Sequence, residues 1–401
     1  MSLALTALTE RQLRARSSLK WSRSAADETP MDIAEADFAV AGPIREALRA
    51  AVRESDLGYP DFDSPHGSPT RLAHQFVRRM SERHNVTVDV DTVEICAQVV
   101  QALCCALLAF TAPGDVVLLH APAYPPMLSA IRSLGRVPLA VPMPVGSDDD
   151  VPDEARAVRV AMIVLCQPHN PTGRILETAR LEALAEIAER NDAVIFCDEI
   201  HHDVTYDRPH LSIASCERAR RRSVVFTSAA KSFNIAGLRC AVGSFGSRRL
   251  HEQFRRLPWH LRSGASVPGI IATYTAWAEC DPWLLQFQKI LHQNRKAIVA
   301  AFGQQCFGGG PDATYLAWIT GNVSASGEFS FGGQAGQSPG KRPKIRLQPG
   351  SVYGTDFSGY FRINFATPPA RLRRAISRLI EGSARAGAER NVHTSSKETT
   401  I

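Results

Sequence analysis

The sequence has 401 residues, of which 44% are hydrophobic and 21% charged, and these values exclude a fibrous or disordered chain. The length allows a large hydrophobic core and about two domains. The formal net charge of +6 is spread along the chain, and its densest basic run, residues 218–222, contains no aromatic residue, so we expect no nucleic-acid partner.

The positions of the cysteines and the lengths of the apolar segments indicate the cellular compartment in which the protein works. None of the nine cysteines forms a C-x-x-C pair, and most lie in apolar runs, as buried thiols of a reducing compartment do. No stretch approaches the roughly 18 apolar residues of a membrane span, and residues 1–8 lack the features of a signal peptide. We therefore expect a cytoplasmic enzyme with no membrane partner.

The pattern along the chain predicts a central sheet domain and a split smaller domain. Residues 1–60 are expected to form an N-terminal arm and part of the small domain, and residues 61–290 the large domain. Between about residues 89 and 245, short β-branched runs alternate with helical patterns, for example the runs 161–165, 194–196 and 224–226. This alternation predicts an α/β fold whose mostly parallel sheet carries helices on both faces.

The C-terminal part is expected to form a smaller αβ domain over residues 291–385, followed by a disordered tail over residues 386–401. Residues 321–344 are rich in Gly and Ser and follow neither helical nor strand periodicity. We interpret this segment as a mobile loop.

Three polar residues follow strands of the predicted sheet, where ligands of such sheets bind: Asn170, Asp198 and Lys231. A lysine can hold pyridoxal phosphate as an imine and move the proton of a substrate α-carbon. A buried carboxylate keeps the pyridine nitrogen protonated, which is the role predicted for Asp198. Asn170 and His201 are candidate donors to the phenolic oxygen, and Tyr124 is predicted to stack on the ring.

The phosphate of such a cofactor calls for backbone amides at a strand-to-helix junction. Residues 96–103 offer that junction, with Val99 and Val100 as the candidate phosphate-binding positions. Ser228 and Arg239, three residues before and eight after the lysine, add a hydroxyl donor and a positive charge.

A substrate α-carboxylate calls for a forked guanidinium, and Arg362 is the candidate for this role. Taken singly, each residue has an ordinary alternative as a surface lysine, a capping aspartate, a turn asparagine or a strand-edge arginine. Their order and spacing along one chain favour a cofactor site.

These motifs resemble those of fold-type I pyridoxal-phosphate enzymes of the class I and II aminotransferase group, over residues 31–381. Within that group the sequence is similar to the carbon–sulfur lyases of the MalY/PatB type, which are related to cystathionine β-lyase. The segments that carry the likeness are residues 34–38, 58–59, 124–126, 168–171, 198–201, 231–234, 314–318 and 361–364.

The resemblance implies an aspartate aminotransferase-like fold with pyridoxal 5'-phosphate as cofactor. It implies α,β-elimination from a cysteine S-conjugate or cystathionine to thiol, pyruvate and ammonia, with Lys231 as the base and Arg362 holding the carboxylate. It also implies a homodimer with shared sites, in which Tyr59 reaches the cofactor phosphate of the neighbouring subunit.

Some residues depart from the lyase pattern. Gln98 stands where the phosphate loop usually opens with glycine, a residue that allows positive φ. Ala230 precedes the lysine where serine is usual, and Arg239 is more typical of aminotransferases. The alternatives are therefore an aminotransferase or a secondary-metabolism enzyme that cleaves, or decarboxylates and deaminates, a bulky S-conjugate. A cofactor-binding regulatory protein without turnover is a further alternative.

Overall fold

The computed structural model describes residues 3–145, 151–323, 329–330 and 345–381, and the chain divides into two compact units. The first unit comprises Met1–Thr6, Ala39–Gln288 and Asp312–Thr314, and the second comprises Ala7–Phe38, Lys289–Pro311 and Tyr315–Ile401. The predicted disordered tail and most of the predicted mobile loop lie outside the described residues. The domain limits at residues 60, 290 and 385 stay a prediction.

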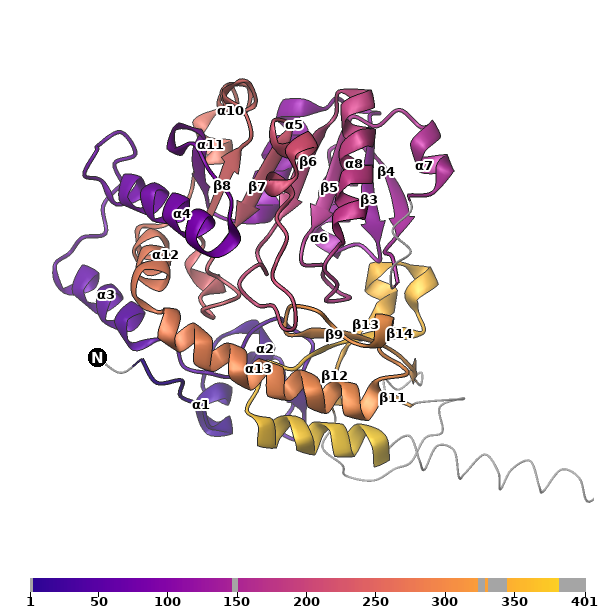
Figure 1. Cartoon of the computed structure of the whole chain (residues 1–401). Coiled ribbons are helices and arrows are strands. Elements are labelled where there is room, and N and C mark those ends of the chain that lie inside the picture. The colour runs from indigo at the N-terminus through magenta and orange to yellow at the C-terminus, as the bar shows by residue number, and fades with distance from the viewer. Residues whose placement is uncertain (1–2, 146–150, 324–328, 331–344, 382–401) are drawn as a thin grey trace, which may run out of the picture. The chain divides into compact units, whose positions relative to one another are not determined.

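A seven-stranded sheet forms the centre of the first unit, in the order β2-β8-β7-β6-β5-β3-β4 (Figure 1). The strands are β2 (Val93–Cys96), β3 (Val116–Ala121), β4 (Val137–Pro142), β5 (Met162–Cys166), β6 (Val194–Asp198), β7 (Ser223–Thr227) and β8 (Ala241–Phe245). Strand β8 runs antiparallel to both of its neighbours, and the other paired strands are parallel. The predicted mostly parallel sheet is confirmed.

The helices of this unit precede the sheet in the chain, connect successive strands, or follow the sheet. They are α3 (Gly42–Arg53), α4 (Ser68–His84), α5 (Val99–Phe110), α6 (Pro125–Ser133), α7 (Asp153–Ala157), α8 (Thr178–Asn191), α9 (Glu217–Arg220), α10 (Arg248–Arg255), α11 (Trp259–Arg262) and α12 (Val267–Glu279). Helix α13 (Asp281–Phe302) begins in the first unit and ends in the second. No helix in the described part of the chain is long and apolar enough to cross a membrane.

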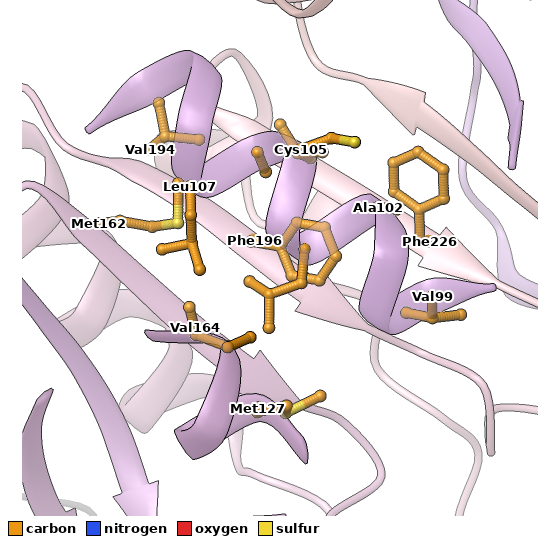
Figure 2. Close-up of a cluster of buried hydrophobic side chains, with 14 of the residues drawn as sticks. Val99, Ala102, Cys105, Leu107, Met127, Met162, Val164, Val194, Phe196 and Phe226 are labelled. Carbon is orange, nitrogen blue, oxygen red and sulfur yellow. The ribbon is translucent and has the colours of Figure 1, made fainter. Parts of the chain in front are cut away.

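Strands β5, β6 and β7 are buried along their whole length and are mostly apolar, as expected for a sheet that is covered on both faces. On one face, Phe196 of β6 and Phe226 of β7 pack into a cluster with α5 and α6 (Figure 2). Leu250 and Phe254 of α10 belong to the same cluster. Helix α8 contacts β5 and β6. The apolar helix α5 therefore begins at the edge of this core, and its first turn lies at the end of β2.

The second unit contains a three-stranded antiparallel sheet in the order β13-β14-β9. Its elements are α1 (Glu10–Arg14), α2 (Leu19–Ser22), β1 (Thr29–Pro30), β9 (Leu316–Thr320), β10 (Asn322–Val323), β11 (Phe329–Ser330), β12 (Ile345–Arg346), β13 (Gln348–Pro349), β14 (Tyr360–Asn364) and a helix over residues 369–381. Strand β1 pairs with β12 in parallel, and β10 pairs with β11 antiparallel.

Asp37 is the polar centre of the second unit. Its buried carboxylate accepts hydrogen bonds from Lys20 Nζ at 3.0 Å and from the indole N–H of Trp21 at 2.8 Å, and Arg371 lies 3.1 Å away. Burial opposes ionisation, but the charges of Lys20 and Arg371 outweigh it and lower the pKa of Asp37. The aspartate of the motif at residues 34–38 thus ties the N-terminal segment to the C-terminal helix.

Candidate functional site

The sheet register brings the predicted cofactor residues to one edge of the sheet. Asp198, the last residue of β6, pairs with the last residue of β5 and with Phe226 of β7. The loops that follow these three strands carry Asn170, His201 and Lys231. Because the carboxyl ends of parallel strands meet at the same edge, the candidate side chains converge there within the first unit.

Asp198 is a buried carboxylate with 4% of its surface exposed. Burial raises its pKa to about 7, although the hydrogen bond from the Ile200 N–H to Oδ1 at 3.0 Å and the charge of Lys231 both act to lower it. In the described part of the chain, Ile200 supplies the only hydrogen bond to this carboxylate. Such a group gains most from a cationic partner, which a protonated pyridine nitrogen would provide.

The loop that carries Lys231 is fixed on both sides of the lysine. The amide of Phe233 donates to the Ala229 carbonyl at 2.9 Å, and the hydroxyl of Ser232 donates to Asp203 Oδ2 at 3.1 Å. Ala229, Ser232 and Phe233 are buried, whereas Lys231 is only half-buried. The backbone of Lys231 is therefore held rigidly at the edge of the sheet.

A buried polar network supports the segment after Asp198. Glu199 accepts hydrogen bonds from the Ser212 hydroxyl at 2.8 Å, the Ile213 amide at 3.1 Å and His210 Nε2 at 2.9 Å. Asp203 forms an ion pair with Arg79 at 2.8 Å. These residues could not be recognised from the sequence, because the partners lie between 11 and 124 positions apart and no local motif connects them.

Two triplets in this network have the composition of a metal site: His84, His202 and Asp203, and Glu199, His202 and His210. Hydrogen bonds already account for the two carboxylates, and His202 Nε2 lies 3.2 Å from Thr227 Oγ1. Burial and the neighbouring His84 lower the pKa of His202 well below its usual value, so its ring is neutral. The network is explained as a hydrogen-bonded anchor for the loop that follows Asp198.

Helix α5 begins where the sequence predicts the phosphate site. Val99 and Val100 are its first two residues, and Gln98 is the N-cap with φ −161° and ψ 156°. This extended conformation is open to any residue, so the position does not require the glycine usual in similar loops. Ala97 is fixed as well, because its N–H donates to Gln101 Oε1 at 2.9 Å.

Ser228 and Arg239 lie near the same end of the sheet, since Thr227 pairs with Val242 and β8 pairs with β2. The Ser228 hydroxyl donates to the Cys240 carbonyl at 2.5 Å and accepts from the Ala230 N–H at 3.1 Å, so its proton is engaged inside the protein. Arg239 Nη1 donates to Gln98 Oε1 at 2.5 Å. The phosphate-binding roles of Ser228 and Arg239 stay predictions.

The two candidate tyrosines have different surroundings. Tyr124 is the N-cap of α6 and is a half-buried ring that packs against the core cluster. Tyr59 is fully exposed. Stacking by Tyr124 and contact of Tyr59 with a partner subunit both stay predictions.

Arg362 belongs to the second unit, in β14. It is 6% exposed, its Nη2 donates to the Asp32 carbonyl at 2.7 Å, and its guanidinium carbon lies 5.9 Å from the centre of the Tyr353 ring. These contacts fix the orientation of the guanidinium. Binding of a substrate carboxylate by Arg362 stays a prediction.

Taken together, the residues of the first unit fit pyridoxal phosphate. Lys231 supplies an amine, Asp198 supplies a buried carboxylate suited to a cation, and the N-terminus of the twelve-residue helix α5 suits a phosphate.

Comparisons with known proteins agree with this geometry. The family model for aminotransferase class I and II matches residues 31–379. The cystathionine beta-lyase of Corynebacterium glutamicum is 28% identical over 376 residues, which cover 92% of this chain and 97% of that protein. The cystathionine beta-lyase PatB of Bacillus subtilis is 28% identical over 380 residues, or 90% of this chain and 95% of that protein.

A solved structure is also similar: that of a candidate PLP-dependent beta-cystathionase from Corynebacterium diphtheriae. It superposes with a TM-score of 0.82 at 25% identity, and the match covers 95% of this chain and 99% of that one. The predicted aspartate aminotransferase-like fold is therefore confirmed.

Proposed function

Because the chain belongs to the class I and II aminotransferase family, we propose that it is a pyridoxal-phosphate-dependent carbon–sulfur β-lyase. Its substrate is a cysteine S-conjugate or a cystathionine-like thioether, and its products are a thiol, pyruvate and ammonia. The observation that carries this proposal is the convergence of Asp198 and Lys231 at the carboxyl ends of β6 and β7. The names of the two relatives support the type of reaction.

The chemistry divides between the cofactor and the chain. Bound pyridoxal phosphate supplies an electron sink for the bond that breaks at the substrate α-carbon. Asp198 holds a proton on the pyridine nitrogen, since a cation beside this buried carboxylate favours its charged form. Lys231, on its fixed loop, removes the α-proton, and Asn170 and His201 donate to the phenolic oxygen.

The products balance with one water molecule. The carbon–sulfur bond at the β-carbon breaks, the sulfur leaves with its electron pair and takes up a proton, and the three-carbon fragment takes up water to give pyruvate and ammonia. The guanidinium of Arg362 holds the substrate carboxylate during these steps.

Transamination is the second candidate function, and Arg239 is the observation that favours it. An arginine at this position is more typical of the aminotransferases than of the lyases, and its guanidinium pairs with Gln98 at the start of α5. An aminotransferase would use the same Lys231 and Asp198, but it would require a keto-acid acceptor and would release no thiol.

The two functions are separated by a product assay. We would incubate the protein with pyridoxal phosphate and either cystathionine or S-substituted cysteines, and measure thiol and pyruvate. Equal amounts of both are expected, and the Lys231→Ala variant should lose at least about 10²-fold in rate. Lys296→Ala, a matched change at an exposed lysine of α13, should keep the parent rate. Amino transfer to a keto acid without thiol would contradict the lyase proposal and support transamination.

We further propose that the chain acts as a homodimer in the cytoplasm. Tyr59 is fully exposed on the single chain, as a residue that binds a partner's cofactor phosphate would be. The nine cysteines, all within the described residues, are unpaired, in keeping with a reducing compartment.

A further inference from the structure

No role has been assigned so far to Gln98, which pairs with Arg239. Arg239 Nη1 and Gln98 Oε1 are 2.5 Å apart at the N-terminus of α5. We infer that Gln98 is a phosphate-binding residue of this chain: its side-chain oxygen aligns Arg239, and its side-chain NH₂ group donates to the 5'-phosphate of pyridoxal phosphate. The inference deepens the proposed function, since it rests on pyridoxal phosphate as the cofactor.

The orientation of the Gln98 amide follows from its partner. A guanidinium carries only donors, so the atom of Gln98 that faces Arg239 must be the oxygen. The NH₂ group sits on the same carbon and is turned away from the guanidinium. No hydrogen bond from this group occurs within the described residues. Its two N–H donors therefore remain for an acceptor at the first turn of α5.

The backbone on the Gln98 side is held in place. The Ala97 N–H donates to Gln101 Oε1, and the Nε2 group of Gln101 donates to the carbonyls of Leu261 and Ser263, each at 2.7 Å. Gln101 thus connects the loop before α5 to the C-terminal end of α11. The backbone next to Gln98 is therefore fixed, and this limits the positions that the Gln98 side chain can reach.

The backbone on the Arg239 side is held equally well. The Ser266 hydroxyl donates to the Leu238 carbonyl at 2.6 Å and accepts from the Gly269 N–H at 3.0 Å. A Cβ on Gly269 would lie 2.3 Å from the Leu238 carbonyl oxygen, so α12 begins in close contact with this loop. Arg239 itself has φ 55°, a left-handed backbone conformation that is unfavourable for a residue other than glycine and persists where the surrounding structure fixes it.

The charges of Gln98 and Arg239 allow both side chains to bind the phosphate at the same time. Gln98 is neutral, so it aligns the guanidinium without cancelling its charge, and Arg239 still has further N–H donors for a phosphate oxygen. A glutamate in place of Gln98 would hold Arg239 more tightly but would repel the phosphate. Exchange of Gln98 for Glu therefore separates alignment of Arg239 from attraction of the phosphate.

The test is a cofactor-binding measurement that needs no turnover. We would remove the cofactor from the full-length parent, Gln98→Ala and Gln98→Glu proteins, and titrate each with pyridoxal phosphate and with pyridoxal, which lacks the phosphate. Binding would be followed by the absorbance of the protein-bound cofactor. Gln304→Ala and Gln304→Glu serve as matched controls, because Gln304 lies at an exposed turn of the second unit.

We expect the Gln98→Ala variant to bind pyridoxal phosphate about 10- to 100-fold more weakly than the parent, the range for loss of a hydrogen bond to a charged group. The Gln98→Glu variant should lose more, both variants should bind pyridoxal like the parent, and the Gln304 variants should match the parent throughout. Unchanged or tighter binding of pyridoxal phosphate by Gln98→Ala would overturn the inference, as would an equal loss for pyridoxal. A parent protein that binds no pyridoxal phosphate would instead refute the proposed function, and this inference with it.

Discussion

At the residue scale, Asp198 has the environment that a cofactor-holding carboxylate needs. Deep burial raises its pKa to about 7, and in the described part of the chain a single amide donates to it. A cation beside it would reverse that shift. The ionised Asp198 side chain therefore lowers the stability of the folded protein without cofactor and raises it when the cofactor is bound.

We predict that Asp198→Asn stabilises the protein without cofactor at pH 8 and leaves its stability unchanged near pH 3.5. The pKa of the carboxyl is 3.8 in the unfolded chain and about 7 in the folded one, so the free energy of unfolding of the parent falls as the pH rises from 4 to 7 and then levels off. Asparagine removes this penalty. The variant without cofactor should exceed the parent in unfolding free energy at pH 8, by on the order of a few kcal/mol, and should equal it near pH 3.5.

Urea denaturation of both proteins at the two pH values measures this difference. Asp56→Asn is the matched control, because Asp56 is exposed and its exchange should change little at either pH. A variant that is less stable than the parent at pH 8 in the absence of cofactor would contradict the account of Asp198.

The sequence predicted the places of some site residues better than their contacts. Asn170 and Lys231 follow β5 and β7 in the structure, and Asp198 is the last residue of β6. These places could be predicted because apolar runs that end in polar residues can be recognised locally. The hydrogen bond from the Ser228 hydroxyl to the Cys240 carbonyl could not be predicted, since it depends on the antiparallel pairing of β8 with β7. The pairing of Gln98 with Arg239, 141 positions away, could not be predicted for the same reason.

At the scale of elements, the antiparallel strand β8 packs closely against its neighbour β7 at Gly243. A Cβ on Gly243 would lie 2.4 Å from Cγ of Phe226 and 2.5 Å from the Val225 carbonyl oxygen. No side chain fits at this position without a shift of β7, the strand that leads to Lys231. Gly243 thus allows the close approach of these two strands.

We predict that Gly243→Ala lowers the free energy of unfolding by about 1–3 kcal/mol, the usual cost of forcing extra atoms into a packed core. Gly237→Ala is the control, because nothing lies within 4 Å of a Cβ at that position. Its effect should stay within about 0.5 kcal/mol. Denaturation midpoints measure both effects, and equal midpoints for the two variants would show that the contact of Gly243 with Phe226 is unimportant.

Some elements escaped prediction for identifiable reasons. Strand β4 contains Pro138 and Pro142, which argue against a strand in sequence, but it is the edge strand of the sheet, where proline is tolerated. Residues 321–344 were predicted to form a loop, and the short strands β10 and β11 at residues 322–323 and 329–330 carry no periodicity long enough to recognise.

At the scale of the whole molecule, the fold class followed from the alternation of strand and helix patterns, but one detail of the division into two units could not be predicted. Asp312–Thr314 belong to the first unit although the residues on either side belong to the second. Asp312 pairs with Arg174 at 3.2 Å and the Thr314 N–H donates to the Val204 carbonyl at 2.8 Å. The assignment of these three residues to the first unit depends on tertiary contacts, which produce no recognisable pattern in the sequence.

The proposed homodimer with shared sites predicts that two defective variants complement each other. Lys231→Ala and Tyr59→Phe should each be impaired at limiting cofactor. A mixed dimer has one site with an intact Lys231 from one chain and an intact Tyr59 from the other. Random mixing should therefore restore about one quarter of the parent's sites.

The measurement is the rate of thiol release after the two variants are unfolded together and refolded, compared with each variant refolded alone. Light scattering should give twice the chain mass of 43.8 kDa. A mixture no more active than the average of its two components would contradict the shared site.

We propose that the cofactor binds at Lys231, beside Asp198, at the carboxyl ends of β6 and β7. Reduction of the cofactor-loaded protein with borohydride, followed by digestion and mass spectrometry, identifies the residue that carries the pyridoxyl group. We expect a single modified residue, Lys231. Modification of another lysine, or of none, in a protein that has taken up pyridoxal phosphate would contradict it.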